Sequence, residues 1–365
     1  MLALRKIVVQ NFRNIEFQEL SFSSNVNCIC GNNGEGKTNL MDAIYYLSMT
    51  KSAFSSSDRY NFRYGTDSFA IAGTYVMPDG MNSKFSVKVS SKGEKKFNRD
   101  DKTYVKISEH IGVLPIVMVS PSDISLVSDS GEERRRFANG VLSQLDHEYL
   151  SSVQQYNRLL AQRNKMLKDH VSDSDLLDAF DSRMSSCAGK IYESRKDFID
   201  SLTPVVSGYY GILSGGNEQV SIGYRSDIEE RPLSETLKAC REKDFVFGYT
   251  TAGIQKDDFV FYMDGHPIRR IGSQGQQKSF LVSLKFAQYD IMKNGYGYPP
   301  VLLLDDVFDK LDLNRISNLL SMVAGSDFGQ IFITDSNKIR MSGIVDGLTS
   351  DSAYFDTSGG VFTRI

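Results

Sequence analysis

The stretch that decides the fold is Gly31-Asn32-Asn33-Gly34-Glu35-Gly36-Lys37-Thr38. The apolar run Val26 to Cys30 predicts a strand entering it, and residues 37–48 predict a helix leaving it. Its glycines let the backbone bend so that N–H groups point at phosphate oxygens. We therefore interpret all eight residues as a phosphate-binding loop of a nucleotide site. Lys37 is expected at the β- and γ-phosphates, and Thr38 is expected to be a magnesium ligand.

A second part of the same site is predicted in residues 301–306, which read Val-Leu-Leu-Leu-Asp-Asp. Four apolar residues predict a buried central strand. The two carboxylates follow at its carboxyl end, where open α/β sheets bind their ligands. We expect Asp305 to hold magnesium, directly or through water, and Asp306 to orient or deprotonate the attacking water. The alternative is a purely structural role, in which the two acids cap a loop.

A third segment of the sequence distinguishes between the protein families that share such a phosphate-binding loop. Gly272-Ser273-Gln274-Gly275-Gln276-Gln277 opens a predicted helix, residues 276–293, and Ser273 lies 32 residues before Asp305. Ser273, Gly275, Gln276 and the free N–H groups of a helix start would form a second anion site. The nucleotide of the same subunit does not need that site. We therefore expect it to face a nucleotide on a second copy of the chain, so that ATP bridges a homodimer.

Two shorter segments carry weaker expectations. The run Asp309-Lys310-Leu311-Asp312 stands where ABC-type ATPases have a subunit-contact loop, ahead of a helix predicted at 313–323. Thr334 and Asp335 stand where such enzymes often place a histidine that senses the γ-phosphate. A polar sensor of different chemistry and loss of the sensing role both remain open.

The order of elements predicts an α/β fold, an ABC-type ATPase head with a mixed sheet and helices that is interrupted by a mainly helical lobe. The ATP-binding lobe I is expected over 1–122 and 245–365, and the helical lobe II over 123–244. Within lobe II, apolar residues at heptad-like spacing predict an antiparallel helical pair at about 146–202. At roughly 25 residues each, these helices would span ~40 Å.

Composition narrows the class of protein further. The 365 residues carry a net charge of −3, so whole-chain charge does not indicate a nucleic-acid binder, and any basic surface must be local. No run of roughly 18 apolar residues suggests a membrane span, and the first residues do not resemble a signal peptide. We expect a cytoplasmic protein without membrane contact, whose four cysteines form no disulfide.

Basic residues gather around the predicted helical lobe. They are Arg134, Arg135, Arg136, Arg158, Arg163, Lys165 and Lys168. They are candidates for contacts with DNA phosphates, which would make affinity fall steeply with salt. The alternative is a solvated helix face with internal salt bridges.

Several segments together resemble the RecF family, which is related to the SMC and Rad50 head domains. The matching segments are 9–14, 36–45, 119–127, 134–137, 162–164 with Tyr156, 273–278 and 303–307. They cover nearly the whole chain. On this resemblance Arg13 and Asn39 are also expected at the nucleotide. The separation of 236 positions between Lys37 and Ser273 agrees with it. SMC and Rad50 proteins insert hundreds of coiled-coil residues there, and transporter subunits insert roughly half as many residues as this chain does.

The resemblance implies an activity and partners. RecF-like proteins dimerise around ATP, bind duplex DNA, act with RecR and RecO, and help place RecA on gapped DNA in recombinational repair and replication-fork maintenance. It implies ATP and Mg²⁺ as cofactors and a weak, DNA-stimulated ATPase activity. One departure is residues 253–258, which read Gly-Ile-Gln-Lys-Asp-Asp where the family has Gly-Pro-His-Arg-Asp-Asp. Another is that residues 51–55 lack the usual basic residue after Ser52.

Three other functions compete with this interpretation. The first is a clamp that binds ATP without significant turnover, suggested by Asp306 in place of the commoner glutamate and by the missing histidine near Asp335. The second is an ATPase that serves a separate nuclease or toxin partner. The third is the motor subunit of a transporter, which the long helical lobe argues against.

Overall fold

The computed structural model describes residues 1–216, 218–307, 328–337 and 351–365, which form two units. Unit 1 comprises residues 1–123 and 285–365, and unit 2 comprises residues 124–284. The second boundary differs from the expected one, because residues 245–284 belong to unit 2. Strand β10 (Asp258–Met263) pairs with β9 (Val220–Arg225), and this pairing holds the segment in unit 2.

Unit 1 contains an antiparallel sheet of order β2-β1-β4-β5-β6-β7. Its strands are β1 (Ala3–Phe12), β2 (Ile15–Ser21), β4 (Ser68–Val76), β5 (Asn82–Ser90), β6 (Lys95–Arg99) and β7 (Lys102–Thr103). In β4 every second residue is buried and its neighbours are half-exposed. This alternation is typical of a sheet with one face on a core and the other toward solvent.

The second sheet of unit 1 has the order β15-β14-β3-β13-β12-β8. Its strands are β3 (Val26–Cys30), β8 (Ile116–Val119), β12 (Val301–Asp305), β13 (Ile331–Asp335), β14 (Ser352–Ser358) and β15 (Val361–Arg364). All pairs are parallel except β14 with β15, and β13 pairs with both β3 and β12. The carboxyl ends of β3 and β12 therefore meet at one edge of the sheet.

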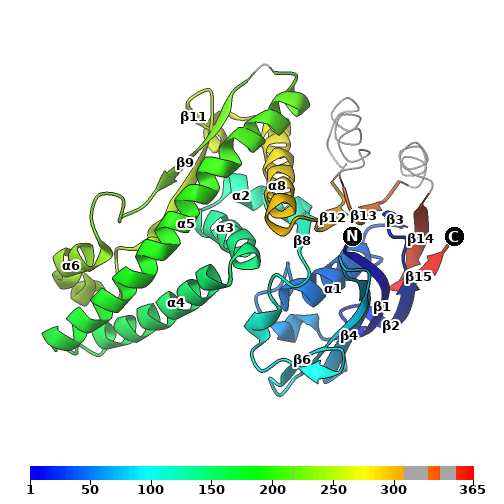
Figure 1. The fold of residues 1–365 in the computed structure, drawn as a ribbon, viewed down its shortest axis with the longest axis horizontal. Helices are drawn as coiled ribbons and strands as arrows, with labels where there is room; N and C mark the ends of the chain where they lie inside the picture. The colour runs from blue at the N-terminus through cyan, green and yellow to red at the C-terminus, as the bar shows by residue number, and fades with distance from the viewer. Residues whose placement is uncertain (217, 308–327, 338–350) are drawn as a thin grey trace. The chain divides into compact units, whose positions relative to one another are not determined.

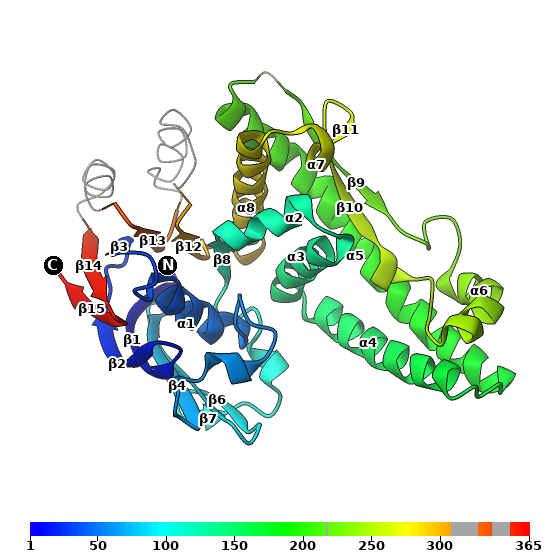
Figure 2. The same cartoon turned by 180° about the vertical axis from the view of Figure 1, so that it is seen from behind.

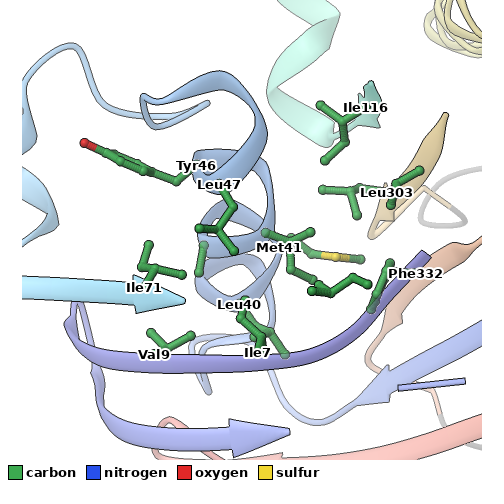
Figure 3. Close-up of a cluster of buried hydrophobic side chains, with 14 of the residues drawn as sticks. Ile7, Val9, Leu40, Met41, Tyr46, Leu47, Ile71, Ile116, Leu303 and Phe332 are labelled. Atoms are coloured by element: carbon green, nitrogen blue, oxygen red, sulfur yellow. The ribbon is translucent and has the colours of Figure 1, made fainter. Parts of the chain in front are cut away.

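Helix α1 (Lys37–Met49) fills the space between the two sheets of unit 1 (Figure 3). Its Leu40, Met41 and Leu47 are fully buried in one hydrophobic cluster. Ile7 and Ile71 of the antiparallel sheet pack there, together with side chains of the parallel sheet, namely Ile116, Leu303 and Phe332. Apolar contacts with both sheets therefore fix the start of α1 at the edge where β3 ends.

Unit 2 is built around two long helices, α4 (His147–Lys168) and α5 (Ser174–Ser214), which lie side by side in Figures 1 and 2. Its other helices are α2 (Ser125–Ser128), α3 (Gly131–Leu145), α6 (Leu233–Phe247), α7 (Ile268–Ile271) and the first part of α8 (Gln274–Tyr296). The antiparallel pair predicted at about 146–202 is α4 with α5. With 41 residues α5 is longer than expected, because buried residues such as Tyr210 continue past Pro204.

A small antiparallel sheet, β11-β10-β9, also packs against α5 in unit 2, with β11 at His266–Pro267. Four short 3-10 helices complete the described elements, η1 (Asp58–Asn61), η2 (Ile107–His110), η3 (Pro121–Ile124) and η4 (Ile254–Lys256). The predicted contact loop at 309–312 and the predicted helix at 313–323 lie outside the described residues. The four cysteines are free thiols. No helix among the described residues combines the length and apolar character that crossing a membrane requires.

Candidate nucleotide site

The phosphate loop links the end of β3 to the start of α1. Gly34 and Gly36 have φ angles of 86° and 108°, which favour glycine because a Cβ atom clashes in this region. At Gly36 a Cβ atom would also come within 2.8 Å of the Asn14 side-chain amide. The first N–H groups of a helix have no partner within that helix and carry partial positive charge. The loop can therefore bind an anion at the start of α1.

Lys37 is buried within the curl of this loop. Its Nζ atom donates hydrogen bonds to the carbonyl oxygens of Gly31, at 2.7 Å, and Asn32, at 3.0 Å. A buried ammonium group is costly unless it has partners, and here the loop supplies them. Phosphate oxygens can replace these carbonyls as acceptors. The charge that the loop needs is thus already in position.

Asp305 accepts hydrogen bonds from two hydroxyl groups. The hydroxyl of Thr38 lies 2.9 Å from one carboxylate oxygen, and that of Thr334 lies 2.7 Å from the other. Burial raises the pKa of Asp305, the two hydroxyl bonds and Lys37 oppose that change, and the charge of Asp306 adds to it. A hydroxyl and a carboxylate are the hard oxygen ligands that Mg²⁺ takes together with phosphates and water. The donor set therefore fits this cation.

Thr334 joins the two acidic residues. Besides donating to Asp305, its hydroxyl accepts a hydrogen bond from the backbone N–H of Asp306 at 2.9 Å. Asp306 has a φ of 51°, in the left-handed region, so the chain turns sharply directly after Asp305. The neighbouring Asp335 is fully buried and accepts from the backbone N–H of Asn337. In the position of the missing histidine, Thr334 thus serves to hold the turn between the two carboxylates.

These groups surround an open hollow of about 250 Å³. Its lining residues are Asn33, Gly34, Gly36, Lys37, Thr38, Asn39, Asp305 and Asp306. The sequence indicates each of these residues as a candidate for the nucleotide site. Residues 33–39 and residues 305–306, which are distant in sequence, meet at this hollow. Of the remaining loop residues, Gly31 and Asn32 give their carbonyls to Lys37.

Glu35 ties the loop to the C-terminal hairpin of β14 and β15, which sequence reasoning missed. Its carbonyl accepts a hydrogen bond from the backbone N–H of Gly360 at 2.9 Å, and its carboxylate accepts one from Gly359. Gly360 has a φ of 83° and lies so near Asn14 that a Cβ atom would be 2.5 Å from its carbonyl oxygen. The Gly359-Gly360 pair was the available signal for a tight turn.

Arg13 lies behind Asn39. Its guanidinium pairs with Asp42 at 2.6 Å and donates to Asn39 at 3.1 Å, while Asn39 donates to Asn14 at 2.7 Å. Asp42 is fully buried, and this burial raises its pKa while Arg13 opposes the change. Asn39 lines the hollow, and Arg13 orients it. Arg13, expected at the nucleotide, is thus placed to act through its neighbour.

The start of α8 lies in unit 2 and has a reciprocal cap. The Ser273 hydroxyl accepts a hydrogen bond from the backbone N–H of Gln276 at 3.2 Å, and the Gln276 side chain accepts one from the backbone N–H of Ser273 at 2.7 Å. This capping box defines the helix start, with Gly275 in its first turn. Gln276 also donates to Glu218 at 2.7 Å. Ser273 is exposed, so the predicted second anion site faces solvent in this unit.

The expected DNA contacts of Arg134 and Arg163 are corrected by the structure. Arg134 is 4% exposed and binds both carboxylate oxygens of Asp258. Arg163 is 0% exposed and pairs with Asp181 and Asp244, each at 2.7 Å. Both guanidiniums are paired with carboxylates inside unit 2 and so are not exposed charges available to DNA. The heptad-like position of Arg163 was the sign that it faces the core.

The remaining basic candidates are closer to solvent. Arg135 donates to the backbone carbonyl of Asp257 at 2.6 Å, and the exposed Arg136 pairs with Glu133 at 2.8 Å. Three more candidates are exposed on α4, namely Arg158, Lys165 and Lys168.

The unusual run at 253–258 has a structural role. Tyr156 donates to Gln255, and Asp257 accepts from Arg195 at 2.5 Å and from Tyr224 at 2.6 Å. These contacts join the run to α4, α5 and β9.

Comparison with known proteins agrees with this geometry. The family model described as RecF/RecN/SMC N terminal domain matches residues 3–348. A protein named DNA replication and repair protein RecF from Bacteroides thetaiotaomicron is 40% identical over 363 residues, which is 99% of this chain and 98% of that protein. The protein of the same name from Flavobacterium johnsoniae is 39% identical over 347 residues, 94% of this chain and 96% of that one.

Solved structures agree at the level of the fold. A structure described as the recombination mediator protein RecF with ATP in the RecFOR pathway has a TM-score of 0.90 and 28% identity, covering 100% of this chain and 99% of that one. An Smc head domain from Pyrococcus furiosus has a TM-score of 0.59 at 15% identity, covering 100% of this chain and 96% of that one, and so shares the fold. The expected fold class, an ABC-type ATPase head with a helical lobe, is thereby confirmed.

Proposed function

Because the chain belongs to the RecF family of DNA replication and repair proteins, we propose that it is an ATP-driven dimer that binds duplex DNA near single-strand gaps. In this proposal RecR and RecO are its partners, and together they help load RecA in recombinational repair and at stalled forks. ATP hydrolysis is slow and stimulated by DNA. The residues of the nucleotide site and the name of the RecF–ATP relative support the ATP-binding part of the proposal.

The observation that carries the proposal is the meeting of Lys37, Thr38 and Asp305 at one hollow. Lys37 would neutralise the β- and γ-phosphates, and the loop N–H groups would bind their oxygens. Thr38 and Asp305 would hold Mg²⁺, which would supply positive charge against the phosphates. Asp306, held in its turn by Thr334, would orient the attacking water.

The second half of the proposal concerns the dimer. The exposed start of α8, with Ser273 and Gln276, supports a role at the nucleotide of a second copy. A ligand that binds the closed dimer and not the separate subunits shifts the population toward the dimer. Hydrolysis would remove the γ-phosphate that joins the two subunits. ATP would then act as a switchable link between subunits.

An ATP-gated clamp without significant turnover is the second candidate. It is favoured by Thr334, which stands where a sensor histidine is common and whose hydroxyl bonds to Asp305 and to the turn at Asp306. The two candidates share the dimer and the DNA, and they differ in the release of phosphate. Measuring phosphate release with saturating duplex DNA separates them.

The central test uses light scattering of the wild type and two variants with ATP and Mg²⁺. We expect wild type to dimerise, Lys37→Ala to remain monomeric, and Asp306→Asn to dimerise and persist. The φ of 51° at position 306 suits asparagine, so this variant should fold normally. Loss of the group that orients water typically costs about 10²–10⁴-fold in rate. A wild type that stays monomeric at saturating ATP would contradict the proposal.

A further inference from the structure

A second hollow, of about 280 Å³, lies within unit 2 where α3, β9, β10 and α7 meet; these elements are labelled in Figure 2. Its charged lining residues are Arg134, Arg225, Asp258, Arg269 and Arg270. With four arginines and one aspartate, the hollow has an excess of three positive charges. The chain as a whole is acidic, with a net charge of −3, so this concentration of positive charge is local.

The single carboxylate of the hollow is already neutralised. Asp258 accepts hydrogen bonds from Nε of Arg134 at 2.8 Å and from its Nη2 at 3.2 Å. Arg134 is buried and also donates to two backbone carbonyls, so it is fixed in this place. Among the described residues that line the hollow, Arg134 and Asp258 form an ion pair with each other. The excess charge therefore lies on Arg225, Arg269 and Arg270.

These three arginines are exposed and come from two rigid elements. Arg225 ends β9, directly opposite Asp258 in the sheet register, and donates to the hydroxyl of Tyr262 at 2.8 Å. Arg269 and Arg270 are adjacent on α7, which Ile268 anchors with an exposed fraction of 1%. Guanidinium groups present several N–H donors in a plane and match phosphate oxygens in pairs. The hollow thus has the donors and charge for a phosphate group.

The chemistry of the hollow favours a phosphodiester over a magnesium nucleotide. At the nucleotide site of unit 1, glycines, a helix start and a carboxylate paired with hydroxyl groups would together bind phosphates and a cation. Here the one lining carboxylate is occupied by both nitrogens of the Arg134 guanidinium. Backbone phosphates of DNA carry one charge each and need no metal.

We propose that Arg225, Arg269 and Arg270 bind backbone phosphates of duplex DNA. This inference rests on the proposed function, in which the chain binds DNA, and it places contacts where Arg134 and Arg163 cannot provide them. The site is near the start of α8 in the sequence, because Arg270 precedes Ser273 by three residues. DNA bound here would therefore contact the segment that we propose to meet the second copy's nucleotide.

The test compares duplex-DNA binding by the full-length wild type and the Arg269→Gln/Arg270→Gln variant across a salt series. Each lost charge-assisted contact should weaken binding by about tenfold, so we expect about 100-fold weaker binding for the double variant. The slope of log affinity against log salt should fall by about two, one for each lost phosphate contact. Adding Arg225→Gln should lower the slope once more.

Two further variants serve as controls. Arg269→Lys/Arg270→Lys keeps the charge and should keep the salt slope, and Arg183→Gln/Arg231→Gln removes two exposed arginines elsewhere in unit 2 and should bind like wild type. Thermal melting and ATP binding show whether each variant is folded. If the double Gln variant binds DNA with the wild-type slope, or loses ATP-induced dimerisation and not DNA binding, the inference is wrong. A wild type without any DNA binding would instead contradict the proposed function itself.

Discussion

The hydroxyl of Thr38 donates a hydrogen bond to the carboxylate of Asp305 at 2.9 Å, although 267 positions separate these residues in the sequence. The contact exists because β13 lies between β3 and β12 in the parallel sheet. The carboxyl ends of those two strands are thereby brought to one edge. We propose that this contact is replaced by a shared magnesium ion when ATP binds, and it provides the first prediction.

Thr38→Ala should remove the effect of Mg²⁺ on nucleotide affinity, whereas Thr38→Ser, which keeps the hydroxyl, should retain it. Asp305→Asn should behave like Thr38→Ala, because an amide is a poor magnesium ligand compared with a carboxylate. Titration calorimetry with ATP, with and without Mg²⁺, measures the difference. Equal Mg²⁺ dependence in wild type and Thr38→Ala would show that the threonine is not a ligand.

Gly360→Ala should weaken ATP binding although the residue lies in the C-terminal hairpin. A Cβ atom there would be 2.5 Å from the carbonyl oxygen of Asn14, so the hairpin must move away from Glu35 of the phosphate loop. Gly80→Ala is a matched control, because Gly80 has a nearly equal φ of 84° but no atom within 4 Å of the added Cβ. We expect similar backbone strain in both variants, and reduced ATP affinity in Gly360→Ala alone.

Arg163→Ala should lower the free energy of unfolding by about 3–5 kcal/mol, because it leaves buried Asp244 without its cationic partner and Asp181 with Arg241 alone. The carboxylates are Asp181 and Asp244, whose side chains are 3% and 0% exposed. Arg158→Ala, at an exposed position of the same helix, should change stability by less than about 0.5 kcal/mol. Urea unfolding of both variants checks this. A small effect of Arg163→Ala would mean that the buried ion pairs of Arg163 contribute little to stability.

The buried side chain of His110 should make the folded protein less stable at acidic pH. Burial lowers the pKa of His110 from 6.5 to about 4, and a hydrogen bond to the carbonyl of Leu47 partly opposes this change. Since that carbonyl can only accept, Nε2 of the neutral ring donates to it at 2.7 Å. Between pH 6.5 and 4 the unfolded chain binds a proton that the folded chain does not, so stability falls as pH falls through this window.

The loss from this histidine should reach about 3 kcal/mol near pH 4. His110→Phe keeps an aromatic ring against Phe97, 4.2 Å from the histidine ring in the wild type, and removes the titrating group. The difference in unfolding free energy between wild type and His110→Phe should therefore change with pH across the window. A difference that stays constant from pH 7 to pH 4 would contradict the assignment.

The sequence alone determined those parts of the protein that depend on neighbours along the chain. The phosphate loop needs glycines at fixed spacing between a strand and a helix, and residues 31–38 contain them. The Asp305-Asp306 pair after four apolar residues indicated where a strand must end. The helical pair followed from apolar spacing, because a helix brings every third or fourth residue to one face.

Only the tertiary structure decided which side chains these elements bring together. Arg163 belongs to the same basic group as Arg158 in the sequence, yet Arg163 is fully buried and Arg158 is exposed. The difference arises because Asp181 of α5 and Asp244 of α6 pair with Arg163 in the interior of the unit. The second boundary of unit 2 depended on the pairing of β10 with β9. The hydrogen bond from Gly360 to the phosphate loop depended on where the hairpin of β14 and β15 lies. Contacts between distant segments depend on the strand order of a sheet, and strand order leaves no signal within any single stretch of sequence.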